Sequence, residues 1–96
     1  MYARVPSFKF AAKDVGAAIQ LFNEKTLPQL HKVAGFKGAT MLVDRETGLV
    51  RTVVYWDSRE ALESSFEPTR ALRAQFVDEL GAEIVSLEVF EVAVQV

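Results

Sequence analysis

Hydrophobic and polar positions divide the chain into segments with strand character and segments with helix character. Residues 2–10 are rich in aromatic and branched side chains, as is typical of a β-strand, and residues 36–44, 49–56 and 84–94 share this character. Pro6 lies inside the first of these segments and has no N–H group to donate, so we expect a bulge or a gap in the strand pairing there.

A helical spacing of apolar residues replaces the strand pattern after Asp14. We expect Asp14 to cap this helix, and Pro28 to break it, with Thr26 capping a short second piece. Gly35 is expected to end the region. The apolar positions that carry the pattern are Val15, Ala18, Ile19, Phe22, Leu27, Leu30 and Val33.

A second helical region follows the third predicted strand. Asp57 and Glu60 have the three-residue spacing of a capping box, which predicts that the helix begins after Asp57. Pro68 is expected to kink this helix or to start its second half, and Gly81 is expected to stop it. The side chains expected to point inward are Leu62, Phe66, Leu72, Phe76 and Leu80.

The segment from Asp44 to Gly48 predicts a tight turn, because Asp favours the start of a turn and Gly supplies a positive φ before the return strand. The resulting order is βαββαβ, in a chain of 96 residues that we expect to form a single domain over residues 1–96. Such an order predicts an α+β fold with a four-stranded antiparallel sheet.

Apolar residues occupy both alternating sets of positions in the last three predicted strands, so both faces of the sheet are expected to be hydrophobic. Two right-handed crossovers place both helices on the same face, which leaves the other face uncovered. A homodimer that pairs these open faces about a twofold axis is the simplest way to bury them. The two sets are Phe36, Gly38, Thr40, Leu42 and Lys37, Ala39, Met41, Val43 in the second strand; Leu49, Arg51, Val53, Tyr55 and Val50, Thr52, Val54, Trp56 in the third; and Val85, Leu87, Val89, Ala93 and Ile84, Phe90, Val92, Val94 in the last.

Composition narrows the functional classes. Hydrophobic residues make up 50% of the chain, and the net charge of −2 comes from interspersed acids and bases, which argues against a nucleic-acid partner. The sequence contains no cysteine, so neither a disulfide scaffold nor a thiolate metal site is possible. No signal peptide or membrane-spanning run is evident, and we expect a cytoplasmic protein without a membrane partner.

Several short motifs together resemble the antibiotic biosynthesis monooxygenase family of the dimeric α/β-barrel superfamily. The resemblance covers essentially the whole chain and implies a ferredoxin-like monomer, a homodimer whose paired sheets form an α/β barrel, and a small cavity between sheet and helices. The motifs are Met1-Tyr2-Ala3-Arg4-Val5, Leu27-Pro28-x-Leu30, Ala34-Gly35-Phe36-x-Gly38 and Tyr55-Trp56-Asp57-Ser58-x-Glu60-Ala61-Leu62.

The resemblance also bears on cofactors. Members of the monooxygenase kind use neither flavin nor metal, so we expect no cofactor. The haem-degrading branch has an Asn early in the chain and a Trp and a His about ten residues apart on the last helix. This chain has neither residue on its last predicted helix and no Asn in its first strand, which disfavours haem degradation.

The candidate ligand-binding residues are mostly aromatic. Trp56 could stack on a planar ligand or anchor the core at the corner between strand and helix. Arg4 and Arg51 could recognise an acidic or phenolate ligand, or could form cross-strand pairs with Glu88 or Glu91. The expected pocket walls are Phe8, Phe22, Trp56, Phe66 and Phe76, and the expected polar contacts are Arg4 and Asn23, the latter with the alternative of an ordinary exposed amide.

Two functional hypotheses follow. The first is a cofactor-independent monooxygenase-like protein that acts on or binds a small aromatic or polyketide-like compound; the second is a non-catalytic homodimeric module that binds a small ligand or is purely structural. No catalytic residue can be named, because His31 is the only histidine and is expected to be solvated, without a metal cluster around it. A cavity beneath Trp56 with convergent polar groups favours the enzyme, whereas solid packing favours the module.

Overall fold

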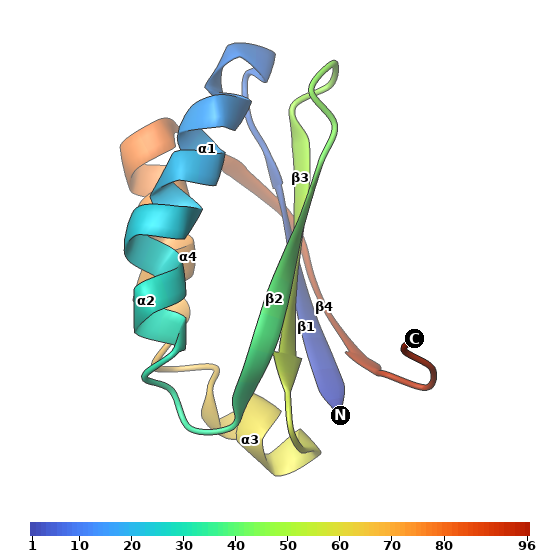
Figure 1. The fold of residues 1–96 in the computed structure, drawn as a ribbon. Helices are drawn as coiled ribbons and strands as arrows, with labels where there is room; N and C mark the ends of the chain where they lie inside the picture. Colours follow the sequence, from blue (N-terminus) through green and yellow to red (C-terminus); the bar gives the residue numbers. More distant parts are fainter.

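Four antiparallel strands form one sheet, and the helices cover only one of its faces (Figure 1). The computed structural model describes all residues from 1 to 96. The strands lie in the order β2-β3-β1-β4, which is the ferredoxin-like α+β arrangement predicted from the sequence. Their bounds are β1 Tyr2–Lys9, β2 Phe36–Val43, β3 Leu49–Trp56 and β4 Glu83–Glu91.

The irregularity predicted at Pro6 is present in the central strand β1. Arg4 pairs with Val54 and Ser7 with Arg51, but the ladder between β1 and β3 has no bridged pair at the two residues between them. On the other side of β1, the register against β4 shifts between Ser7 and Phe8. Pro6 therefore occupies a central strand at the point where one ladder is interrupted, because its ring nitrogen has no hydrogen to donate.

The first helical region is one bent run rather than two capped helices. It comprises a 3₁₀ turn, η1 (Ala12–Asp14), then α1 (Val15–Leu21), a π-helical turn, η2 (Phe22–Thr26), and α2 (Leu27–Leu30). The two capping predictions here were wrong. Asp14 makes no side-chain capping bond, because its backbone is already helical as the last residue of the 3₁₀ turn, whereas a capping residue is extended.

Thr26 does not cap α2 because the helix never stops at this point. The backbone of Thr26 is helical, and the next N–H, that of Leu27, donates to the Phe22 carbonyl in the wide π turn. Pro28 follows directly after the π turn, and the helical run continues through it although it has no N–H to donate. The chain accommodates the proline by widening one turn instead of breaking. The prediction that Gly35 ends the helix was wrong, because α2 already ends at Leu30; Gly35, with φ of 83°, lies in the turn that leads into β2.

The second helical region consists of α3 (Arg59–Ser64) and α4 (Arg70–Leu80), separated at Pro68 as expected. Its N-cap is Ser58, not the predicted Asp57. Ser58 has the extended backbone of a cap, and its Oγ accepts a hydrogen bond from the Ala61 N–H over 3.0 Å. Gly81 adopts the left-handed conformation and stops α4, as predicted.

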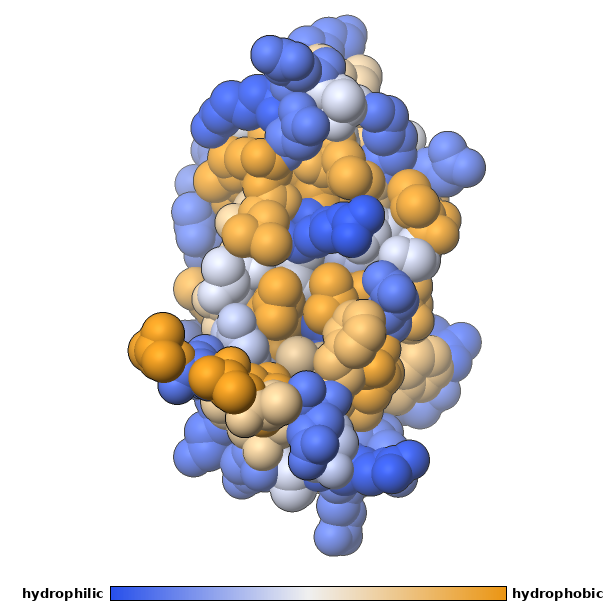
Figure 2. Space-filling view, turned by 90° about the vertical axis from the view of Figure 1, so that its right-hand side faces the viewer, coloured by the Kyte–Doolittle hydropathy of each residue, from blue (hydrophilic) through white to orange (hydrophobic).

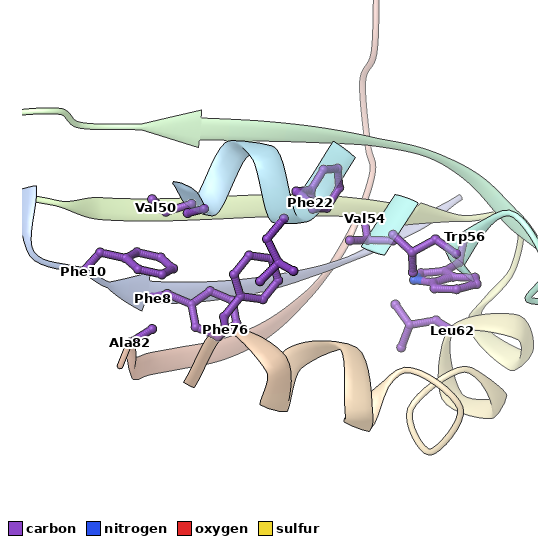
Figure 3. Close-up of a cluster of buried hydrophobic side chains, with 12 residues drawn as sticks. Phe8, Phe10, Phe22, Val50, Val54, Trp56, Leu62, Phe76 and Ala82 are labelled. Carbon is purple, nitrogen blue, oxygen red and sulfur yellow. The ribbon is translucent and has the colours of Figure 1, made fainter. Parts of the chain in front are cut away.

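The core lies between the sheet and the helices (Figure 3). The Phe76 ring of α4 lies 5.1 Å from the ring of Phe8 and 6.1 Å from that of Phe10, centroid to centroid. Val50, Val54 and Trp56 come from alternate positions of β3, so all three point to the helix-covered face. Trp56 is only 1% exposed, which makes it part of the core as well as a candidate ligand contact.

The opposite, open face of the sheet carries the exposed apolar surface predicted from the sequence. Figure 2 views this face and shows hydrophobic surface across its middle, crossed by one polar strip and bordered by polar groups at both ends. Leu42, which pairs with Arg51, and Phe90, which pairs with Ala3, are 53% and 51% exposed on this face. Tyr55 lies on this face because Trp56, its neighbour in β3, points to the helices.

Two strand irregularities change the predicted face assignments. The register of β2 against β3 shifts between Phe36 and Gly38, so Phe36 packs on the core together with Ala39 instead of sharing a face with Gly38. The shift between β1 and β4 has a similar effect, since Ile84 pairs with Phe8 and Leu87 with Pro6, which places Ile84 and Leu87 on one face. A period-two pattern cannot reveal such bulges.

Candidate functional site

A small cavity lies between the sheet and the helices, and we call it the helix-side cavity. Its volume is about 40 Å³. Aromatic and aliphatic side chains form most of its wall, together with two arginines and three threonines. The cavity lies beneath Trp56, where the sequence analysis placed a candidate site. It is lined by Arg4, Pro6, Phe8, Phe22, Thr26, Leu30, Thr52, Val54, Trp56, Thr69, Leu72, Arg73 and Phe76.

The local structure of each element explains why these side chains converge. Alternation in β3 sends Thr52, Val54 and Trp56 to the same face of the sheet. On the helical side, Phe22 and Thr26 are four residues apart and both belong to the π turn η2. A π turn carries an extra residue within the helix and is often found at functional sites. This turn therefore supplies one wall of the cavity.

Two polar atoms in the cavity wall have no hydrogen-bond partner in the protein. They are the hydroxyl oxygen of Thr26 and the indole Nε1 of Trp56, both fully buried. In Figure 3 the indole nitrogen lies on the edge of the ring that faces the rest of the labelled cluster. Buried polar groups are nearly always paired, so these two atoms are the candidate contacts for an ordered water or a hydrogen-bonding guest.

Arg4 projects from β1 toward the helices and is only 4% exposed. Its guanidinium donates one hydrogen bond of 2.8 Å to the Ser65 hydroxyl and one of 2.7 Å to the Leu62 carbonyl. Burial lowers the pKa of Arg4. The predicted cross-strand pair with Glu88 or Glu91 was wrong for Arg4, because its side chain points to the helix layer and forms no ion pair.

Arg51 also lacks the predicted acidic partner. It lies on the open face of β3, is exposed, and takes part in none of the ion pairs of the molecule. An exposed guanidinium is hydrated by water, so it needs no carboxylate in the way that a buried one does. The sequence showed that both arginines lie in apolar strands, but it did not show that they point to opposite faces.

Arg73 of α4 is the second cation of the cavity. Its guanidinium donates to the Thr69 hydroxyl over 2.7 Å and to the Phe66 carbonyl over 3.1 Å. The same guanidinium lies 4.7 Å from the centre of the Phe66 ring, and that of Arg4 lies 5.2 Å from it. Burial, followed by the nearby Arg4 and Arg70 charges, lowers the pKa of Arg73 to about 10, so it stays protonated at neutral pH.

The structure brings five of the seven candidate residues together, namely Arg4, Phe8, Phe22, Trp56 and Phe76. Phe66 lies beside the cavity, where its ring contacts three arginines instead of forming the wall. Asn23 is exposed and does not reach the cavity, in agreement with the alternative that it is an ordinary surface amide. The ligand-binding role of all seven stays a prediction.

Sequence reasoning missed Arg73 and the three threonines. Arg73 precedes the inward-pointing Phe76 by three residues, so both lie on one side of α4, and this spacing was a usable signal. Nothing in the pattern around Thr26, Thr52 or Thr69 distinguishes them from surface threonines.

The cavity wall contains no residue suited to hold a metal or to remove a proton. Arg4 and Arg73 are its only ionisable groups, and no cluster of His, Asp or Glu in the protein could bind a metal ion. His31 is exposed and contacts the ring of Phe36, with the centroids 5.0 Å apart. The wall also offers no imidazole, thiolate, thioether or phenolate to ligate haem iron, so these residues do not fit a haem cofactor.

None of the helices has both the length and the apolar character needed to cross a lipid bilayer.

Comparison with known sequences gives relatives but no family assignment. No family model matches the chain. The uncharacterised protein Rv2557 of Mycobacterium tuberculosis is 33% identical over 85 residues, which cover 88% of this chain and 38% of that protein. The uncharacterised protein Rv2558 of the same species is 29% identical over 94 residues, which cover 95% of this chain and 39% of the relative. The chain thus spans about two fifths of the curated relatives that it matches.

Solved structures confirm the fold. The chain is similar to an antibiotic biosynthesis monooxygenase-type protein of Deinococcus radiodurans (TM-score 0.70, 15% identity, 100% of this chain and 96% of the other). It is similar to the cofactor-independent oxygenase SnoaB of Streptomyces nogalater (TM-score 0.70, 16% identity, covering 98% of this chain and 94% of the other). It is also similar to the haem-degrading MhuD of Mycobacterium tuberculosis (TM-score 0.73, 20% identity, covering 100% of this chain and 99% of the other).

A dimeric ferredoxin-like protein from an uncultured marine organism has the same fold (TM-score 0.69, 12% identity, 99% of this chain and 96% of the other). The structural neighbours thus include an antibiotic biosynthesis monooxygenase-type protein, which is the kind of protein that the sequence resembles, and a protein described as ferredoxin-like. Because these proteins are only 12–20% identical to the chain, the structural similarity establishes the fold alone.

Proposed function

From the fold that this chain shares with antibiotic biosynthesis monooxygenase-type proteins, we propose that it is an oxygenase-like protein that binds a small aromatic compound in the helix-side cavity. The observation that carries the proposal is the pair of unpaired polar atoms, Trp56 Nε1 and Thr26 Oγ1, in a cavity walled by aromatic rings. Aromatic walls suit a planar ligand, and the two polar atoms suit its oxygen substituents.

The proposed chemistry requires little of the protein. In a cofactor-independent oxygenation at an activated CH₂ group, CH₂ and O₂ give C=O and H₂O, and the substrate itself supplies the electrons. The cavity wall has no general base, so the substrate must be acidic enough to lose its proton without one. The roles left to the chain are to orient the substrate, to bind its oxygens and to exclude water.

Entry of an aromatic compound requires the cavity to widen. Pockets that enclose drug-sized ligands have volumes of roughly 300–1,000 Å³, whereas the helix-side cavity has about 40 Å³. The π turn η2 and the segment between α3 and α4 border the cavity and contribute Phe22, Thr26 and Thr69. Both are irregular parts of the helix layer, so movement there disturbs fewer regular hydrogen bonds than movement of the sheet does.

We propose further that the chain forms a homodimer through the open face of the sheet. Large apolar side chains on this face are about half exposed in the single subunit, including Leu42 and Phe90. A second copy would cover them with an identical surface and would complete the α/β barrel implied by the sequence resemblance. The helix-side cavity lies on the other face, so each subunit would keep its own binding site.

Oxygen uptake with anthrone-like and hydroquinone compounds tests the proposed activity. We expect the wild type to consume oxygen with at least one of them and the variant Trp56→Phe, which keeps a ring but loses the N–H donor, to be slower by about tenfold or more. Tyr55→Phe is the matched control, since it removes a polar group from the neighbouring residue on the opposite face. Absence of uptake with every compound, or equal loss in both variants, would contradict the proposal.

A non-catalytic ligand-binding module is the second candidate, and the lack of any general base in the cavity wall favours it. In this case the same compounds would bind in the helix-side cavity without oxygen consumption. Binding is measurable through the fluorescence of Trp56, the only tryptophan of the chain. Saturable binding together with a flat oxygen trace would identify the module.

A further inference from the structure

We infer that the helix-side cavity selects an anionic ligand, whose carboxylate or enolate oxygen is bound by Arg4 and Arg73 together. This inference rests on the proposed function in one respect, namely that the ligand occupies the same cavity. It adds the charge of the ligand, which neither the fold nor the similar proteins specify. Four observations support it, concerning charge balance, burial, available donors and the polar atoms around the cavity.

The first observation is an excess of positive charge around one aromatic ring. The guanidinium groups of Arg4, Arg70 and Arg73 lie 5.2, 5.3 and 4.7 Å from the centre of the Phe66 ring. One carboxylate balances this group, that of Glu67, and it pairs with Arg70 over 2.7 Å. Arg4 and Arg73 are left without an acidic partner, since no ion pair of the protein includes them.

The second observation is that these two cations are not hydrated as surface arginines are. Arg4 is 4% exposed, and Arg73 is only partly exposed. All their hydrogen-bond acceptors are neutral, namely two hydroxyls and two backbone carbonyls. A buried cation without a counter-ion carries a large desolvation cost, and two close together add their repulsion. An anion between them would remove both costs.

The third observation concerns the donors that remain. A guanidinium has five N–H donors, and the structure shows two in use on Arg4 and two on Arg73. Both side chains belong to the wall of the helix-side cavity, and their other N–H groups make no hydrogen bond within the protein. The planar guanidinium fork matches the two oxygens of a carboxylate, which makes arginine the preferred residue for such recognition.

The fourth observation is that the unpaired polar atoms of the same wall suit the same ligand. Trp56 Nε1 can only donate a hydrogen bond, and the Thr26 hydroxyl can donate one. No carboxylate belongs to the cavity wall, and its two charged groups, Arg4 and Arg73, are both cations. Such a wall binds an oxygen-rich anion better than a neutral compound of the same shape.

Benzoate and benzamide form a matched pair of probes, because they have nearly the same size and differ in charge. Binding to the wild type is followed by the fluorescence of Trp56 and, independently, by the rise in melting temperature with probe concentration. We expect benzoate to bind saturably, with an affinity about tenfold or more above that of benzamide. Equal affinities, or no binding of either probe, would overturn the inference without any variant having to fold.

The variant Arg73→Gln tests whether Arg73 is responsible for the preference for benzoate over benzamide. We expect it to lose about tenfold or more in benzoate affinity and little in benzamide affinity. Arg59→Gln is the matched control, since Arg59 is exposed and pairs with Glu63 on the surface. Benzoate affinity that is unchanged in Arg73→Gln, or that falls equally in both variants, would count against the proposed site.

The two proposals fail in distinguishable ways. If benzoate binds through Arg73 but no aromatic compound consumes oxygen, the anion site stands and the oxygenase activity is wrong. If compounds are oxidised while benzoate and benzamide bind equally, the activity stands and the selection of an anion is wrong.

Discussion

Phe76 shows how one residue serves both the core and the candidate site. Its ring packs against the tilted ring of Phe8, meets Phe10 edge to face, and also forms part of the cavity wall. The substitution Phe76→Ala would remove these contacts and enlarge the cavity. We expect the free energy of unfolding to fall by about 3–5 kcal/mol, measured by urea denaturation.

The control for this prediction is Asp78→Ala, which changes an exposed position of the same helix. It is expected to alter the free energy of unfolding by about 0.5 kcal/mol or less. A loss of less than about 1 kcal/mol in Phe76→Ala would show that the helix layer collapses into the space, and that the cavity is not held open by a rigid core.

At the level of single elements, two glycines test how the turn and the first helix are built. Gly48 has φ of 81°, and a Cβ at this position would overlap the Phe10 carbonyl oxygen. We expect Gly48→Ala to lower the free energy of unfolding by roughly 1–3 kcal/mol. Gly16 lies in α1 with no atom near its virtual Cβ, so Gly16→Ala is expected to raise it by about 0.5–1 kcal/mol. Thermal or urea unfolding of both variants measures these two changes in the free energy of unfolding. Changes of the same sign in the two variants would contradict the prediction.

The start of α3 supplies a second test at this level. The Ser58 hydroxyl satisfies the free Ala61 N–H, whereas Asp57 makes no hydrogen bond through its side chain. We expect Ser58→Ala to lower the free energy of unfolding by about 1 kcal/mol, and Asp57→Ala to have less than half that effect. Denaturant unfolding measures both losses of unfolding free energy. A larger loss in Asp57→Ala than in Ser58→Ala would support the capping box predicted from the sequence.

For the whole molecule, the open face of the sheet is the surface through which we propose that two copies pair. Val53 lies on this face of β3, on the side opposite to Val54. A carboxylate there would be buried without a partner in a sheet-to-sheet dimer, so we expect Val53→Asp to be a monomer. Light scattering over a range of concentrations measures the molecular mass of the wild type and of Val53→Asp.

The matched control for Val53→Asp is Gln29→Glu, which adds a negative charge on the exposed side of α2 and should leave the dimer intact. A wild type that is monomeric at every concentration, or a Val53→Asp variant that stays dimeric, would contradict the proposed pairing of open faces.

The sequence by itself determined the order of the elements and the hydrophobic character of both sheet faces. It did so because these properties depend on local periods and on turn residues such as Gly48 and Gly81, which act within a few positions of the chain. Even the interruption at Pro6 followed from a missing N–H alone. The same local reasoning failed by one residue at Ser58, because Asp57 and Ser58 are equally suited to cap a helix until the backbone angles are known.

Only the tertiary structure decided what surrounds the cavity. Arg4 and Arg73 are 69 positions apart in the chain, yet both contact the ring of Phe66. Whether a strand arginine meets a carboxylate on the next strand or a hydroxyl on a helix depends on which face it occupies and on what packs above it. The unpaired state of Trp56 Nε1 and Thr26 is likewise a property of the packed interior. Local pattern fixes which way a side chain points along its own element, but the partners it meets come from distant parts of the chain.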